Sequence, residues 1–279
     1  MINLKDCACF GVAGNFTGHL EQAGEANDFK NVKTAEKNAP KALFPTYIPK
    51  KSENIPEFLN VFPFNSEKII FPKNEQKIQI EPECAVVFDA EWKGGKVVSL
   101  RPLCFGASND VSIRKEGAKK ISIKKNWGEC SKGFAENRIV VDSFSESGIL
   151  NRYRIASFMV RDGNVFSYGE DSAVRDYSYI YEKLTEWLIE KLNNQKDEGP
   201  AENINSYLNA AGCPTQIMVS IGATRYTDFG ERNFLEKGDK SVVVLYPENK
   251  YSQSQILNLV KENNFSDKEI SVLAQEVVL

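Results

Sequence analysis

The sequence has little of the chemistry that usually marks a zinc site or a disulfide framework. It contains one histidine, His19, and its six cysteines include no Cys-x-x-Cys pair. A zinc knuckle is therefore not expected, and a chain of 279 residues does not need disulfides to fold. The closest pair, Cys7 and Cys9, fits two small residues that alternate in a first strand. These features favour a reducing cytoplasm.

Long apolar runs and an excess of basic residues are also absent. No stretch approaches the roughly 20 apolar residues of a membrane span, and the N-terminus lacks the apolar segment of a secretion signal. With 35 basic and 38 acidic residues, the net charge is -3, so no basic field favours nucleic acid. The densest basic stretch, residues 119–125, alternates like a half-exposed strand over 121–124, and we expect its lysines on the surface. We expect a soluble protein without nucleic-acid or membrane partners.

What the sequence does contain is a dense series of strand signals. Its 42% hydrophobic content can fill a core, and the expected class is α+β, mostly β. The turn Asp162-Gly163-Asn164 is typical of a hairpin. We divide the chain into an N-terminal segment with a His19-bearing lid (1–75), a β-roll core (76–247) and a helical C-terminal extension (248–279). Further strands are expected at 7–12, 77–80, 84–89, 96–100, 138–141, 154–160, 165–168, 216–221 and 241–246.

Helices are expected in five places. A polar piece over 20–29 is followed much later by a long amphipathic helix, with Asp176 as its N-cap and apolar residues from Tyr177 to Leu192 at spacings of three and four. A shorter helix over 204–211 ends at Gly212. Two amphipathic pieces, 253–261 and 267–275, make up the C-terminal extension, which reads as an appended tail.

Three acidic residues form a candidate metal site. Pro82 favours an extended backbone, so Glu81 and Glu83 should point to the same side of a strand that begins there. Asp110 lies in a polar turn after an apolar approach. Three carboxylates without a nearby imidazole or thiolate favour Mg²⁺ or Mn²⁺, with Ca²⁺ as a further possibility. From spacing alone, a solvated strand face with Asp110 capping its own turn is the simpler explanation.

Five motifs, in order, resemble those of the fumarylacetoacetate hydrolase family. The matching stretches run over about residues 8–246, and five ordered motifs are more specific than any one of them. They are Asn15-Phe16-Thr17-Gly18-His19, Glu81-Pro82-Glu83, Asn109-Asp110-Val111-Ser112-Ile113-Arg114, Trp127 with Ser131-Lys132, and Ser220-Ile221-Gly222-Ala223-Thr224.

The resemblance implies a β-roll of mixed sheets around a metal ion, usually in a homodimer. It implies an enzyme that acts on a small 2-oxo acid, such as an acylpyruvate, and hydrolyses a carbon–carbon bond through an enolate held by the metal. By position, Glu81, Glu83 and Asp110 would bind the metal. The remaining implied roles are catalysis for His19, the base, and for Lys132, and substrate binding for Arg114, Asn15 and Thr224.

The sequence also departs from the family pattern. Where the family places a glutamate three residues after the histidine, this chain has Gln22. Either Glu21 or Glu25 compensates for it, or the activation of water is impaired. The late Thr-Gly-Thr-Pro motif is altered as well, which favours an unusual substrate. Two alternatives therefore stay open. One is an isomerase or decarboxylase of the same family, and the other is a non-catalytic binding protein that keeps the fold.

Overall fold

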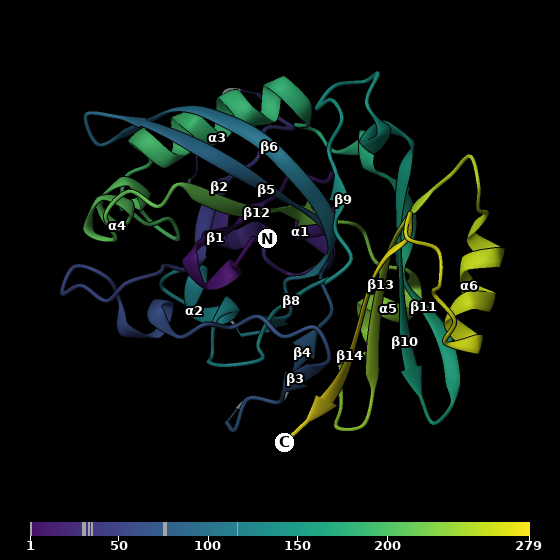
Figure 1. Ribbon diagram of the computed structural model, residues 1–279. Helices are drawn as coiled ribbons and strands as arrows, with labels where there is room; N and C mark the ends of the chain where they lie inside the picture. The colour runs from purple at the N-terminus through teal and green to yellow at the C-terminus, as the bar shows by residue number, and fades with distance from the viewer. Residues whose placement is uncertain (1, 30–31, 33, 35, 75–76, 116) are drawn as a thin grey trace.

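The computed structural model describes residues 2–29, 32, 34, 36–74, 77–115 and 117–279 (Figure 1). The described strands are β1 Ala8–Ala13, β2 Ala42–Tyr47, β3 Lys68–Ile70, β4 Ile78–Gln79, β5 Pro82–Lys93, β6 Lys96–Asn109, β7 Ser112–Ile113, β8 Gly133–Phe134, β9 Ile139–Val140, β10 Tyr153–Arg161, β11 Asn164–Ala173, β12 Gln216–Ala223, β13 Lys240–Pro247 and β14 Ser271–Val278. The α-helices are α1 His19–Gln22, α2 Ser122–Lys125, α3 Tyr181–Asn194, α4 Ile204–Ala210, α5 Asp228–Arg232 and α6 Gln253–Glu262. Short 3₁₀ turns are Leu4–Asp6, Ala26–Phe29, Glu57–Asn60, Ile149–Arg152 and Val174–Asp176. The predicted mostly β, α+β class is confirmed.

Two large sheets and one short ribbon organise the described residues. A seven-stranded sheet has the order β2-β1-β12-β5-β6-β8, with β9 also paired to β6, and a five-stranded sheet has the order β11-β10-β13-β14-β3. Strands β4 and β7 form the ribbon. The pairs β1–β12 and β14–β3 are parallel and the other pairs are antiparallel, so the predicted mixed sheets are confirmed. Figure 1 shows α3 lying across the curled β5–β6 pair and α6 beside β10 and β11.

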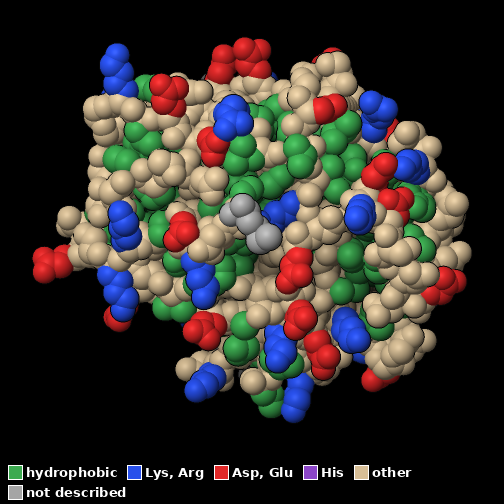
Figure 2. All heavy atoms as spheres, in the orientation of Figure 1, with side chains coloured by type: hydrophobic (Ala, Val, Ile, Leu, Met, Phe, Trp, Pro, Cys, Tyr) green, Lys and Arg blue, Asp and Glu red, His purple; other side chains and the backbone are tan. Residues whose placement is uncertain are grey.

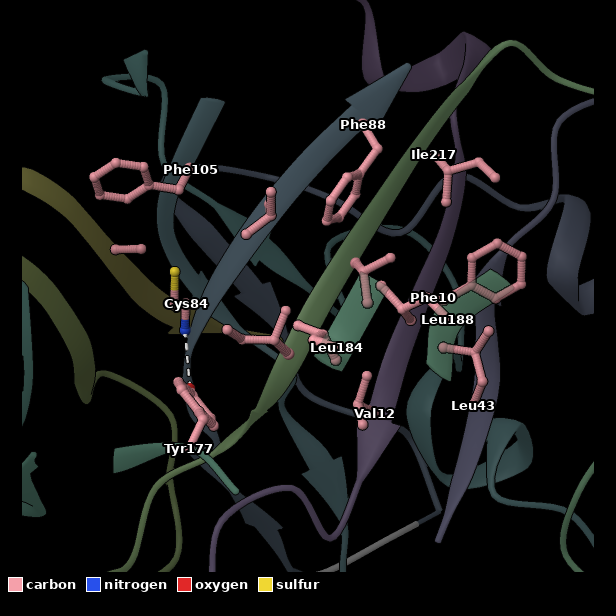
Figure 3. Packing of buried hydrophobic residues seen from close by; sticks show 14 of the residues in the cluster. Phe10, Val12, Leu43, Cys84, Phe88, Phe105, Tyr177, Leu184, Leu188 and Ile217 are labelled. Atoms are coloured by element: carbon pink, nitrogen blue, oxygen red, sulfur yellow. Dashed lines mark hydrogen bonds between the residues drawn. The ribbon is translucent and has the colours of Figure 1, made fainter. Parts of the chain in front are cut away.

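Strand β5 carries the core on both of its faces. Cys84 and Phe88 belong to the main core cluster together with Leu184 and Leu188 of α3 (Figure 3), while Val87 belongs to a second cluster on the opposite face. This alternation is the period of two that a strand imposes on its side chains. Because both faces are covered, the start of β5 is held firmly in place, and the candidate site lies there.

The predicted hairpin is present, and each large sheet combines strands from more than one of the expected segments. Arg161 and Asn164 close the turn between β10 and β11, with Gly163 at a positive φ of 76°. Strands β1 and β2 share a sheet with β12 and β5, and β14 pairs with β13. The division at residues 75 and 247 stays a prediction, but the sheets are continuous across both positions.

The prediction of a strand over residues 121–124 is wrong. The segment forms the short helix α2, and Lys124 and Lys125 on it are 3% and 2% exposed instead of solvated. The alternation of Ile121 with Ile123 misled the sequence interpretation, because Ile121 is buried while Ile123 is 45% exposed. The two lysines form long-range ion pairs, and these contacts determine the local structure more strongly than the alternating pattern does.

The prediction of a helix over residues 267–275 is also wrong. Residues Ser271–Val278 form β14, whose side chains alternate between buried and exposed. The buried Leu273 and Val277 are four residues apart, a spacing that a helix and a strand both place on one face. Because β14 pairs with β13 on one side and β3 on the other, the tail is an integral part of the five-stranded sheet. The preceding helix over 253–261 is confirmed as α6.

Two other helices differ from prediction at their ends. The long helix begins at Tyr181 with Ile180 as its N-cap, and Asp176 instead ends a 3₁₀ turn. The polar piece expected over 20–29 is divided into α1 and a 3₁₀ turn, with Gly24 at a positive φ of 70° between them. Glycine tolerates this conformation and interrupts the helix there. The helix expected over 204–211 is confirmed as α4.

No helix of the described ranges is long and apolar enough to cross a bilayer. Figure 2 shows acidic and basic side chains mixed over the face of the molecule that it draws.

The fully buried Asn15 ties three segments together, and its removal tests the fold directly. Its Nδ2 donates to the carbonyls of Tyr179 (2.9 Å) and Ile221 (2.8 Å), and its Oδ1 accepts from Tyr179 N (2.8 Å). We expect Asn15→Ala to lower the free energy of unfolding by about 2–4 kcal/mol, because it leaves buried backbone groups unpaired. Urea denaturation measures this change. The exposed Asn54→Ala is the control, and an equal loss in both variants would contradict this role.

Buried Glu202 gives a prediction about pH. Ser122 Oγ of α2 donates to its carboxylate, and burial raises the pKa of Glu202 to about 7 despite this hydrogen bond. A folded-state pKa above the unfolded value means that the folded chain binds more protons, so stability falls as pH rises from 4.5 to about 7. We expect Glu202→Gln to be more stable than wild type by about 3 kcal/mol at pH near 8, and by almost nothing at pH near 4.5. Urea denaturation at the two pH values measures this, and a pH-independent difference would be contrary to the prediction.

Candidate active site

Three carboxylates meet where β5 begins and β6 ends. Pro82, the first residue of β5, pairs with Asn109, the last residue of β6, so Glu81 and Asp110 lie just beyond the paired ends. The Asp110 N–H donates to the Glu81 carbonyl at 3.1 Å. One carboxylate oxygen from each of Glu81, Glu83 and Asp110 lies within 4.8 Å of the other two, and all three side chains are buried. The acids predicted from the sequence are therefore clustered and could bind a metal ion.

Asn109 holds this junction against the second sheet. Its Oδ1 accepts the Glu81 N–H at 3.1 Å. Its Nδ2 donates to Ser241 Oγ of β13 at 3.0 Å and to Gln275 Oε1 of β14 at 3.1 Å. In the Asn-Asp turn, the asparagine therefore holds the backbone in place and the aspartate contributes its carboxylate to the site. Strand β14, misread as a helix from the sequence, supplies one of these contacts.

Arg114 and Lys132, which the sequence resemblance placed beside the acids, reach them in the structure. Arg114 Nη2 lies 2.8 Å from Glu81 Oε1, and Lys132 Nζ lies 3.0 Å from Asp110 Oδ1. Lys132 also donates to the Val111 carbonyl, and its ammonium lies 5.2 Å from the centre of the Trp127 ring. Only 1% of Lys132 is exposed, so a solvated loop lysine is excluded.

Lys125 contacts the carboxylates most closely, and it was expected on the surface. Its Nζ lies 2.5 Å from Glu81 Oε2 and 2.8 Å from Asp110 Oδ2, so one ammonium bridges two of the three acids. Phe44 packs beneath it, with 5.1 Å between Nζ and the ring centre. Its neighbour Lys124 pairs with Glu25 at 2.9 Å. The sequence interpretation missed both lysines, because their own pattern indicated a half-exposed strand.

The charges at the site set the pKa values of its members. Burial alone would raise the pKa of Glu81, but Lys125 and Arg114 outweigh it and hold this pKa well below its usual range. Burial would likewise lower the pKa of Lys125, but Asp110 and Glu81 raise it above its ordinary value. This pair is therefore ionised at neutral pH.

Glu83 has the opposite environment. Burial, followed by repulsion from Asp110 and Glu81, raises its pKa well above the usual range. Its Oε2 accepts the Gly222 N–H at 2.8 Å. Gly222 has a positive φ of 120°, and a side chain there would begin 3.0 Å from Asn15 Cβ. The glycine of the late motif therefore lets the backbone approach Glu83.

His19 begins α1 and faces the same region. Its Nδ1 lies 2.8 Å from the Thr224 carbonyl, which can only accept, so Nδ1 carries the proton and Nε2 is free to act as a base. Burial lowers the pKa of His19, although the charge of Glu81 acts against this, and the imidazole is neutral at pH 7. The ring packs at 5.2 Å from that of Tyr226.

The three candidates for orienting His19 are placed differently from expectation. Gln22 forms hydrogen bonds with the backbone of Tyr226, donating to its carbonyl at 3.1 Å and accepting its N–H at 2.9 Å. Glu21 is exposed. Glu25 is buried, and Arg114 and Lys124 each lie 2.9 Å from its Oε1. The Thr224 carbonyl therefore holds Nδ1, and catalytic roles for Glu21 and Glu25 stay predictions.

The two remaining residues of the substrate-binding prediction have different surroundings. Asn15 uses both of its amide protons on backbone carbonyls, so it offers no N–H to a ligand. Thr224 keeps a buried hydroxyl for which no hydrogen-bond partner occurs in the described part of the chain. A role in substrate binding stays a prediction for both residues.

Two spaces adjoin the acids. A small cavity of about 10 Å³, lined by His19, Glu81, Glu83, Glu25 and Lys125 among others, is about the size of one water molecule. A cleft of about 510 Å³ opens on the other side and is lined in part by Glu25, Arg114 and Lys124. Glu25 borders both spaces and therefore lies between the cleft and the inner cavity.

The donor set matches a divalent ion in type, but the neighbouring cations compete with it. Glu81 and Asp110 each pair with two protein cations, and Lys125 is common to both. A divalent ion would bind the same oxygens at about 2.1 Å, beside an ammonium that it strongly repels. With Lys125 in this position, the site does not fit a divalent ion.

Comparison with solved structures supports the fold. A 2-keto-3-deoxyarabinonate dehydratase has a TM-score of 0.57 and 18% identity, and the match covers 97% of this chain and 73% of that one. The 2-keto-3-deoxy-D-arabinonate dehydratase complexed with magnesium and 2,5-dioxopentanoate gives 0.54 and 17%, over 97% and 72%. A 2-hydroxyhepta-2,4-diene-1,7-dioate isomerase from Mycobacterium marinum gives 0.52 and 13%, over 97% and 74%. These are members of the fumarylacetoacetate hydrolase superfamily, and the resemblance seen in the motifs is confirmed for the fold.

Sequence comparison assigns the chain to one family and finds no curated relative. No match is found among curated proteins. Residues 25–277 match a family of unknown function, DUF5718, and this stretch includes the acids and their cations. The chain therefore belongs to the family DUF5718 and has a fold similar to that of fumarylacetoacetate hydrolase-superfamily enzymes.

Proposed function

We propose that this protein is an enzyme that hydrolyses a carbon–carbon bond of a small 2-oxo acid through an enolate. The observation that carries the proposal is the unprotonated Nε2 of a buried, neutral His19 beside a cavity of one-water size that also borders the acidic cluster. A general base next to a site for one water is what a hydrolytic step needs. The relative crystallised with 2,5-dioxopentanoate binds a molecule of the proposed class.

The outer cleft supports an acidic substrate. Its described lining contains four basic residues, Lys77, Arg114, Lys115 and Lys124, and two acidic residues, Glu25 and Glu231. Basic side chains that line a cleft attract small anions. The volume of about 510 Å³ is sufficient for a small 2-oxo acid. The substrate would enter by this cleft and place its reacting carbonyl towards His19.

The proposed reaction is balanced with the groups at hand. Nε2 of His19 takes a proton from water, and the hydroxide attacks the carbonyl carbon next to the bond that breaks. The electrons of the broken bond form the enolate of the 2-oxo acid. The positive charges of Arg114, Lys125 and Lys132 stabilise the negative charge that develops on it. Protonation of the enolate carbon by the imidazolium returns His19 to its neutral form. The products are a carboxylic acid and a shorter 2-oxo acid.

The finer predictions from the sequence belong with this proposal. The two alternatives from the sequence differ in what they require. An isomerase or decarboxylase forms the enolate but needs no attacking water, and a binding protein needs neither the enolate nor the water. The sequence predicts Mg²⁺ or Mn²⁺, with Ca²⁺ as an alternative. The position of the Lys125 ammonium opposes the binding of any of these ions. The homodimer and the cytoplasmic location stay predictions.

Replacement of His19 separates these reactions. We expect wild type to convert acylpyruvates in a panel of 2-oxo acids, and His19→Ala to lower kcat/KM by about 10²–10⁴-fold, because the water loses its base. Mass spectrometry in water labelled with heavy oxygen should find the label in the carboxylic acid product. The exposed Glu57→Gln is the matched control. Unchanged turnover in His19→Ala would refute the base, and products without label would favour isomerisation or decarboxylation.

A further inference from the structure

We propose that the Lys125 ammonium takes the place of the divalent ion at this site, so that the intact protein excludes Mg²⁺ and Mn²⁺. This inference concerns the occupant of the carboxylate cluster. It does not depend on which reaction the protein catalyses. Its test therefore uses no substrate, and its failure would be distinct from a failure of the proposed function.

The position of Lys125 is the first support. Its Nζ lies 2.5 Å from Glu81 Oε2 and 2.8 Å from Asp110 Oδ2, and both acids belong to the cluster whose oxygens lie within 4.8 Å of one another. These two carboxylates, with Glu83, are the oxygen ligands that a divalent ion would use. Because the ammonium already lies against both carboxylates, a divalent ion at the same oxygens would strongly repel it.

The balance of charge is the second support. The buried carboxyl groups in the cluster and its surroundings are Glu25, Glu81, Glu83 and Asp110. The cations that pair with Glu25, Glu81 and Asp110 are Arg114, Lys124, Lys125 and Lys132. The three carboxylates in these ion pairs thus face four positive charges among the described residues. A divalent ion would add two uncompensated charges to a buried site, which is strongly unfavourable.

The anchoring of α2 is the third support, because it shows that Lys125 is built into the site. Ser122 at the start of α2 donates to buried Glu202, and Lys124 pairs with Glu25 at 2.9 Å. Lys125 itself is 2% exposed and lies over the Phe44 ring. A surface lysine that folded inward by chance would lack these contacts on both sides.

Removal of Lys125 would release two of the acidic oxygens. They are Glu81 Oε2 and Asp110 Oδ2, which lie 2.5 Å and 2.8 Å from its Nζ in buried side chains. Carboxylate oxygens released in this way are available to a metal ion. Replacing Lys125 by a neutral residue removes one positive charge and frees the space beside these oxygens. The variant should therefore bind an ion that wild type rejects.

The experiment is a titration of the full-length chain with Mn²⁺ alone, followed by the electron paramagnetic resonance signal of the free ion. We expect wild type to show no binding below about 1 mM, and Lys125→Gln to bind one equivalent at least about 100-fold more tightly. Lys119→Gln, in the same basic stretch but exposed, is the matched control and should behave as wild type. Adding Glu83→Gln to Lys125→Gln should abolish the gained binding.

Several results would overturn the proposal. One is stoichiometric binding of Mn²⁺ by wild type at micromolar concentration, and another is a Lys125→Gln variant that gains no binding. Thermal unfolding provides a second readout, since Mn²⁺ should raise the Tm of Lys125→Gln and leave that of wild type unchanged. Lys125→Met tests the same charge removal with a side chain of similar length. If both variants stay unfolded even when refolded with Mn²⁺, the ion cannot replace the ammonium and the proposal is wrong.

Discussion

The burial of several carboxylates at one point is the constraint on which the rest of this structure depends. Like charges at such short separations cannot all be ionised in a buried site unless cations lie beside them. The chain meets this requirement with side chains from distant parts of its sequence, and Lys125 bridges Glu81 and Asp110. The buried helix α2, the Asn109 junction and the contact of Gly222 with Glu83 all serve to hold these groups together.

The sequence predicted the parts of the site that local rules determine. Pro82 begins the strand and places the Glu81 and Glu83 side chains on the same side of it. The apolar residues that follow define β5, and the Asn-Asp turn places Asp110 beside them. It failed where long-range contacts decide. Lysines are solvated by default, and nothing near Lys125 in the chain reveals that Glu81, 44 residues earlier, will lie against its ammonium.

The same distinction explains the other errors in the fold and around His19. Leu273 and Val277 suit a helix and a strand equally, and only the pairing with β13 and β3 selects the strand. The acceptor for His19 Nδ1 is a backbone carbonyl at Thr224, 205 residues away, and a search for a nearby carboxylate could not find it. Backbone acceptors carry no side-chain signature. Their place is known only once the strands are aligned.

The fold and the site together show one difference between this chain and a protein of similar fold. A relative of similar fold was crystallised with magnesium, whereas this chain has the carboxylates and, among them, an ammonium. The most direct test is a crystal structure of the intact protein grown with Mn²⁺, with anomalous scattering recorded. We predict no anomalous peak among Glu81, Glu83 and Asp110, and Lys125 Nζ within hydrogen-bond distance of Glu81 and Asp110. A strong peak among the three acids, with Lys125 turned away, would contradict this account.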